Sequence, residues 1–188
     1  MVAGHAVSAC AASGLRIVTP PNAPPDISRR MPVDDAPPHQ GISIGGRGHF
    51  FGHEVVAPAE GVVVFSRGNH VRIHHGLDSD QQDIYTEHFH VHGPLIKVGD
   101  KVDRGQAIGS IGVGKNTNLP NYHYVVIKME GPRRFIALNP IDYWLGIAQY
   151  KEKLEKGLDT GPFVIPCFDL NVDYPSEPIR FNYPAKCK

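Results

Sequence analysis

The apolar pattern changes at residue 40, where short runs rich in Val and Ile begin, separated by glycine. Runs of this length and composition are typical of strands. We predict strands at 41–44, 54–57, 61–65, 70–74, 83–91, 106–111 and 123–128. Gly-Gly, Gly-Asn and Gly-Asp pairs between the runs indicate turns. Strand–helix–strand alternation is not seen, so we expect an all-β-dominated fold with an antiparallel sheet or sandwich core.

One stretch near the C-terminus has a helical period. Asn139 is a suitable N-cap, Pro140 suits the first helical position, and Gly157 suits the end of a helix. We therefore predict one helix over 139–156 that packs on the domain. Its apolar face contains Tyr143, Trp144, Ile147, Tyr150 and Leu154.

The two flanks of the chain are rich in proline. Seven prolines lie between residues 20 and 38, which predicts a connector without regular structure over 11–38. The C-terminal residues 158–188 have no regular period and are predicted to wrap around the domain. We therefore divide the chain into an N-terminal segment and connector (1–38), a central domain (39–145), and the end of the helix with a tail (146–188).

Charge and hydropathy exclude two classes of function. Nineteen basic residues balance nineteen acidic residues, and no basic patch is present, which argues against a nucleic-acid partner. No stretch is long and apolar enough to predict a transmembrane helix.

The three cysteines bear on the cellular compartment. Val7-Ser8-Ala9-Cys10 matches a bacterial lipobox but follows a very short leader, so either the true start lies upstream or the match is chance. Cys167 and Cys187 could form a disulfide that closes a loop of about 20 residues, worth roughly 3 kcal/mol. Two free thiols are the alternative. The cysteine pattern fits export, so we expect an extracytoplasmic location (periplasm or cell envelope), with Cys10 as the candidate lipid anchor.

The strongest chemical signal is a series of short fragments in a fixed order. Eleven histidines already raise the question of a metal site. The fragments are His39-Gln40-Gly41-Ile42-Ser43, Ala57-Pro58-Ala59-Glu60-Gly61-Val62-Val63, Glu87-His88-Phe89, Val98-Gly99-Asp100-Lys101-Val102, Gly105-Gln106-Ala107-Ile108-Gly109, Pro120-Asn121-Tyr122-His123 and Asn139-Pro140.

In this order the fragments resemble the LytM/lysostaphin-type peptidoglycan endopeptidases, over about residues 39–145. The resemblance implies a zinc ion on an antiparallel sheet, held by two His and one Asp, with a water molecule at the fourth position. Two further His assist the chemistry in that family. It also implies peptidoglycan stem or cross-link peptides as partners. A zinc with three protein ligands and one open position can ionise water near neutral pH.

Two family positions are changed in this chain. His39 and His123 match the ligating His, but Ser43 stands at the position of the ligating Asp. Among the catalytic positions, His88 matches one His, with His90 as a rival because its spacing to Gly99-Asp100 is closer to the family's. Asn121 stands at the position of the other catalytic His.

Both changes weaken the expected chemistry. A neutral hydroxyl such as that of Ser43 is a poor zinc ligand beside a carboxylate, and the Asn121 amide cannot exchange a proton. We expect His39 and His123 to converge, with His88 or His90 facing the same cleft. A replacement third ligand stays open as an alternative, from Asp35, His49, His53 or Glu54.

Three functions are compatible with this pattern. The first is an active zinc endopeptidase that cleaves peptidoglycan cross-links. The second is a relative with impaired or absent activity that binds stem peptides or activates another cell-wall hydrolase. The third is a β-sandwich scaffold, which has no need of His39, His88 and His123. The changes at Ser43 and Asn121 favour the second.

Overall fold

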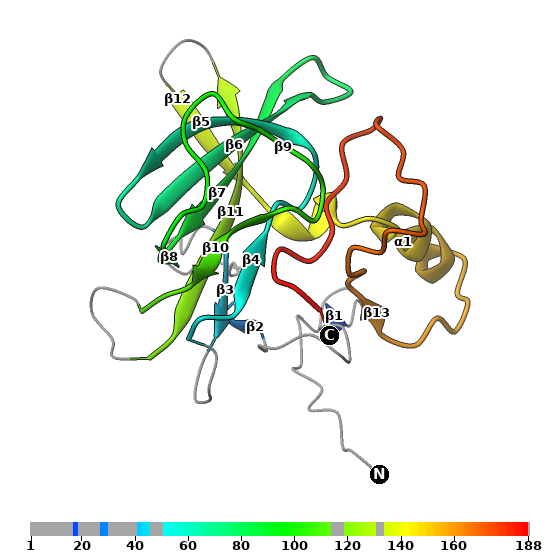
Figure 1. The fold of residues 1–188 in the computed structure, drawn as a ribbon. Helices are drawn as coiled ribbons and strands as arrows, with labels where there is room; N and C mark the ends of the chain where they lie inside the picture. Colours follow the sequence, from blue (N-terminus) through cyan, green and yellow to red (C-terminus); the bar gives the residue numbers. More distant parts are fainter. Residues whose placement is uncertain are drawn as a thin grey trace.

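The computed structural model describes residues 17–18, 27–29, 41–45, 51–113, 119–130 and 134–187 (Figure 1). Within them the chain forms thirteen strands, one 3-10 helix and one α-helix. The strands are β1 (Ile17–Val18), β2 (Ile27–Arg29), β3 (Ile42–Gly45), β4 (Glu54–Val56), β5 (Gly61–Arg67), β6 (His70–Leu77), β7 (Asp83–Phe89), β8 (Val91–His92), β9 (Lys101–Val102), β10 (Ala107–Ile111), β11 (Asn121–Glu130), β12 (Arg134–Leu138) and β13 (Phe163–Val164).

Three sheets organise these strands. The main sheet has eight strands in the order β2-β3-β11-β7-β6-β5-β9, with β12 also paired to β11. A second sheet has the order β4-β10-β8, and β1 pairs with β13 in a third. All pairings in the two larger sheets are antiparallel. The predicted all-β-dominated, antiparallel fold is confirmed.

The core lies between the main sheet and the β4-β10-β8 sheet. Side chains alternate along each strand, so one face of the main sheet points inward and the other outward. On β11, Tyr122, Tyr124 and Val126 are fully buried in the core, and they pack in one cluster with Val55 of β4 and Ile108 of β10. These inward positions fix the outward direction of Asn121 and His123.

The predicted helix over 139–156 is divided in two, so this prediction was partly wrong. Asn139 caps a 3-10 helix over Pro140–Tyr143, and α1 begins only at Ile147 and ends at Glu155. Between them Trp144 is extended and forms a parallel bridge with Phe181 of the tail. The tail supplies backbone hydrogen bonds at Tyr143 and at the residue after Trp144, which compete with helix continuation.

The C-terminal tail wraps around the domain, as predicted. In Figure 1 it runs from α1 back along the β4-β10-β8 sheet. Phe181 and Tyr183 are fully buried, and Ala185 bridges Val55 at the outer edge of β4. Cys187 is bonded to Cys167 in a disulfide.

The proline-rich connector contains two short strands, which corrects the prediction that it lacks regular structure. Ile27–Arg29 pairs with β3, and Ile17–Val18 pairs with β13. Both stretches are free of proline, so their backbone amides remain available for pairing. Cys10 lies outside the described residues. No helix in the described part of the chain is long and apolar enough to cross a membrane.

Candidate functional site

The candidate site lies on the outward face of the main sheet, where β3, β11 and β7 pair. His123 of β11 stands opposite Ser43 of β3 on one side and Phe89 of β7 on the other. Directly opposed residues share a sheet face, so the three side chains gather on one side. This register brings together residues that are 80 positions apart in the chain.

Ser43 and His123 are in direct contact. The Ser43 hydroxyl oxygen lies 3.2 Å from Nδ1 of His123, and the Ser43 residue is only 4% exposed. The two residues to which the resemblance assigns metal positions are therefore neighbours in the fold. When Ser43 donates to Nδ1, it uses the lone pair through which that nitrogen would bind a metal.

Asn121 lies two residues before His123 on β11 and therefore points to the same face. It stands opposite Gly45 of β3. Its Oδ1 atom is buried and accepts no hydrogen bond from the described residues. A side-chain amide can orient a bound group through hydrogen bonds, but it cannot act as a general acid or base.

His88 lies on the opposite face of the sheet. It is paired with Tyr124 across β7 and β11, and its side chain is fully buried. Its Nδ1 atom is 2.6 Å from the Tyr122 hydroxyl, inside the core. The expectation that His88 could face the cleft with His123 is therefore corrected, because alternation along β7 turns it inward.

His90 interrupts the strand and does not follow the alternation that includes His88. Its φ of 63° separates β7 from β8 within the single strand predicted over 83–91. Its carbonyl accepts from the amide of Gly112 at 2.8 Å. It lines a hollow of about 270 Å³ together with Phe51 and His92. Of the two rivals for the catalytic position, His88 is hydrogen-bonded to Tyr122 inside the core, whereas His90 lines this hollow.

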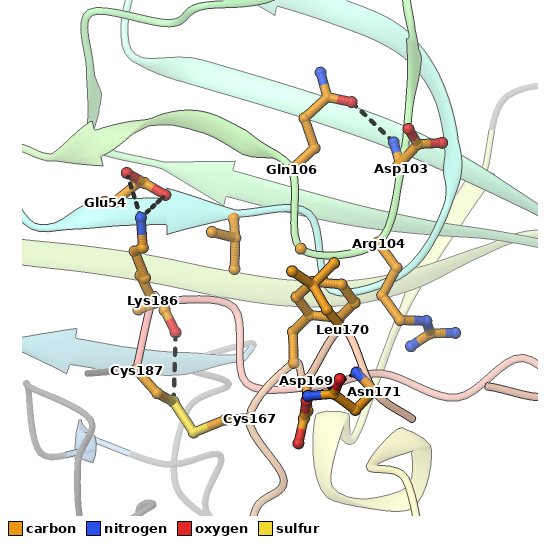
Figure 2. Close-up of a pocket in the computed structure, with 14 residues that line it drawn as sticks. Glu54, Asp103, Arg104, Gln106, Cys167, Asp169, Leu170, Asn171, Lys186 and Cys187 are labelled. Atoms are coloured by element: carbon orange, nitrogen blue, oxygen red, sulfur yellow. Dashed lines mark hydrogen bonds and ion pairs between the residues drawn. A yellow bond between two sulfur atoms is a disulfide. The ribbon is translucent and has the colours of Figure 1, made fainter. Parts of the chain in front are cut away.

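Of the other candidate ligands, His39, Asp35 and His49 lie outside the described residues. His53 lies inside them, just before β4, and its backbone carbonyl accepts from the amide of Ile111 at 2.7 Å. Glu54 forms an ion pair with Lys186 of the tail at 3.2 Å, which Figure 2 shows. This pair borders a cavity of about 790 Å³ between the β9–β10 turn and the disulfide-bonded tail. The Glu54 carboxylate is therefore oriented toward the tail.

The described residues do not by themselves supply the three ligands of a hydrolytic zinc site, and His39 lies outside them. Such a site takes three strong protein ligands. Within the described ranges no group of three or more His, Cys, Asp and Glu side chains could hold a metal. Of the three residues to which the resemblance assigns metal positions, His123 and Ser43 are described, and they contact each other.

The sheet face beside His123 carries an aromatic and charged surface. The Phe89 ring lies 5.9 Å from that of His123 and stacks on His70 at 4.2 Å. Arg72 and His70 both contact the Glu87 carboxylate. Burial alone would raise the pKa of Glu87, but the contacts with His70 and Arg72 outweigh it and hold the pKa below its usual range. The carboxylate is thus committed to an ion pair.

Sequence reasoning missed a buried polar network behind this face, built by His75, Thr86, His88 and Tyr122. Thr86 and His88 are two residues apart on β7, with apolar Ile84 on the same face. Two polar residues in consecutive inward positions of a strand are the signal that could have indicated it.

Comparison with known proteins gives a family. A model described as peptidase family M23 matches residues 37–135. The chain is 35% identical over 93 residues to the peptidoglycan DD-endopeptidase ShyA of Vibrio cholerae serotype O1, which covers 47% of this chain and 20% of ShyA. The chain thus spans about a fifth of this relative's length.

Two solved structures are similar to this chain at lower sequence identity. The catalytic domain of lysostaphin from Staphylococcus simulans is 22% identical with a TM-score of 0.46, over 56% of this chain and 78% of that one. The catalytic domain of EnpA from Enterococcus faecalis is 27% identical with a TM-score of 0.44, over 62% and 86%. Since the family model matches more than half of the chain, the resemblance to the LytM/lysostaphin-type peptidases is confirmed, and the chain belongs to peptidase family M23.

Proposed function

We propose that this chain acts in the cell envelope by binding peptidoglycan stem or cross-link peptides, with zinc endopeptidase activity impaired or absent. Membership of the family and the identity to a peptidoglycan DD-endopeptidase support the substrate class and the extracytoplasmic location. The residues proposed for the site are His39, Ser43 and His123 at the metal positions, with His90 and Asn121 beside them.

The contact between Ser43 and His123 carries this proposal. The 3.2 Å contact between the Ser43 hydroxyl and His123 supports a shared site, in which we propose that the neutral hydroxyl takes the position of the family's ligating carboxylate. Without that carboxylate, His39 and His123 would form a two-imidazole site of low affinity. Asn121 removes proton transfer as well, which is typically worth about 10²–10⁴-fold in rate. What is left is an outward sheet face with hydrogen-bonding groups and aromatic rings.

The first experiment measures zinc affinity by calorimetry for the wild type and for Ser43→Asp, Ser43→Ala and Asn121→His. Ser43→Asp is expected to raise the affinity by more than about tenfold, since it restores a ligand. Ser43→Ala is the matched control. It removes the hydroxyl without adding a metal ligand, so the zinc affinity is expected to stay low. Asn121→His is expected to leave the affinity unchanged, because that position serves the chemistry.

The second experiment measures function. Wild-type protein is expected to co-sediment with purified peptidoglycan and to release few or no peptides from it, as followed by mass spectrometry. The double variant Ser43→Asp/Asn121→His is expected to gain more turnover than the two single variants together, because a metal-bound hydroxide and its proton-transfer partner act as a unit.

One result would refute the proposal. This is robust zinc-dependent hydrolysis by the unmodified protein that His123→Ala abolishes. It would support the alternative, an active endopeptidase with a third ligand drawn from Asp35, His49, His53 or Glu54.

A further inference from the structure

A continuous chain of hydrogen bonds crosses the core directly behind the candidate site. It begins at the Tyr122 hydroxyl, 2.6 Å from Nδ1 of His88. Nε2 of His88 is 2.8 Å from the Thr86 hydroxyl, which is 2.7 Å from Nε2 of His75. Nδ1 of His75 is 2.6 Å from the backbone carbonyl of Glu60. The chain thus links β11 through β7 and β6 to the residue that precedes β5.

The donor and acceptor capacities of these groups decide which atom carries the proton in each hydrogen bond. The Glu60 carbonyl can only accept, so Nδ1 of His75 carries a proton and donates it. If His75 is neutral, its Nε2 accepts, and the Thr86 hydroxyl must donate to it. Thr86 has spent its one proton and therefore accepts from Nε2 of His88. Nδ1 of a neutral His88 then accepts from Tyr122, so all four bonds run in one direction.

Burial supports the neutral state of both imidazoles. Thr86, His88 and Tyr122 are each 0% exposed, and His75, nearer the end of the chain of bonds, is partly buried. Burial lowers the pKa of His75 to about 4. Burial also holds the pKa of His88 well below its usual range, with smaller contributions from His75 and His70.

This chain is not a route for protons. Its last acceptor is the backbone carbonyl of Glu60, which cannot release a proton onward, and its first donor is a phenol inside the core. Its effect is therefore on geometry. Tyr122 stands between Asn121 and His123, and neighbouring side chains on a strand point to opposite faces. A fixed Tyr122 hydroxyl consequently fixes the rotation of β11 and the direction of both outward residues.

We propose that the one-way network Tyr122–His88–Thr86–His75–Glu60 is a positioning device that holds Asn121 and His123 in place from the core side of the sheet. Within it Thr86 is the central positioning residue, because it is the single bridge between the two imidazoles. This role is independent of the proposed function, since it concerns the direction of the site residues whatever they bind.

The first test uses the unmodified protein. Long-range ¹⁵N–¹H NMR spectra of the histidine rings distinguish a protonated from an unprotonated ring nitrogen. At neutral pH we expect His75 as the Nδ1–H tautomer and His88 as the Nε2–H tautomer. The Nε2–H tautomer at His75, or a charged ring at either position, would overturn the assignment.

The second test uses Thr86→Val, which keeps the shape of the side chain and removes the hydroxyl, beside Thr86→Ser, which keeps the hydroxyl. Thr86→Val is expected to shift the ring signals of His123, on the other face of the sheet, and to speed amide exchange at residues 121–124. Thr86→Ser is expected to restore the wild-type signals. Uniform loss of stability alone would leave the native-state His123 signals unchanged.

A third variant keeps the proposal testable if Thr86→Val does not fold. Tyr122→Phe removes only the terminal donor. It is expected to leave His88 as the Nε2–H tautomer, which Thr86 still fixes, but to shift the His123 ring signals and to speed exchange in β11. Tyr150→Phe is the matched control, because it also removes one phenol hydrogen bond, which Tyr150 donates from α1 to the Gly161 carbonyl and not from β11. A folded Thr86→Val or Tyr122→Phe with wild-type His123 signals and unchanged β11 exchange would overturn the proposal.

Discussion

Acid is expected to weaken the fold before the carboxylates are protonated. In the unfolded chain His75 takes up a proton near its ordinary pKa of 6.5, whereas burial lowers the pKa in the folded chain to about 4. The stability is therefore complete above pH 6.5 and is lost as the pH falls toward about 4. The charged groups that act on this ring are those of His74 and Arg104, and both lower the pKa further.

The magnitude follows from the two pKa values. One pKa unit corresponds to about 1.4 kcal/mol, so the His75 contribution reaches about 2 kcal/mol between about pH 7 and pH 5 and about 3 kcal/mol by pH 4. His88 acts in the same direction, because burial lowers its pKa too. Glu87 has a lowered pKa and adds its own loss below its ordinary value of 4.5, so the range above pH 5 isolates the histidines.

The assay is urea unfolding at a series of pH values with the disulfide intact. Trp144 is the single tryptophan and is only 1% exposed, so its fluorescence reports unfolding. The variant His75→Gln cannot titrate at this position, and it is expected to reduce the slope between pH 6.5 and pH 5 to the part that His88 contributes. A wild-type slope near zero in this range, or the same slope in His75→Gln, would show that the ring is not held neutral by burial.

Two further predictions concern the tail. Cys167→Ser/Cys187→Ser is expected to lower the unfolding free energy by about 3 kcal/mol, as measured by urea unfolding, because it frees a loop with a sequence separation of 20 in the unfolded chain; an unchanged midpoint would contradict this. Arg104→Met is expected to cost about 2–4 kcal/mol and to speed amide exchange over 180–187, because Nη1 of Arg104 donates to Pro58, Arg180 and Asn182. Unchanged exchange in the tail would count against that anchoring role.

Local pattern predicted the site only where strand alternation holds. The resemblance assigned Ser43 and His123 to one metal site, and the register of β3 and β11 places them opposite each other. The inward and outward faces of β7 could not be predicted in this way, because polar His88 and Thr86 occupy inward positions that usually hold apolar residues. The positive φ of His90 ends the strand, and nothing in the surrounding residue types indicates it.

Long-range pairing explains the other differences. Asn139 and Pro140 do start a helical turn, but the tail hydrogen-bonds at Tyr143 and Leu145 and stops it. Local sequence around Tyr143 cannot predict this pairing, because Phe181 lies almost forty positions further along the chain. The same holds for Ile27–Arg29, whose strand exists because β3 offers an edge.

The position of the tail determines where a stable fragment of this domain can end. The amide of Val56 donates to the carbonyl of Pro184, and the amide of Lys186 donates to that of Glu54, so residues 184–186 occupy the outer edge of β4. An unoccupied strand edge is a template for pairing with other chains. A fragment limited to the family-matched residues 37–135 would expose this edge, together with the apolar surface that Phe181 and Tyr183 cover. We therefore expect the tail to block edge-to-edge pairing at β4, and a folded unit of this domain to extend past residue 135.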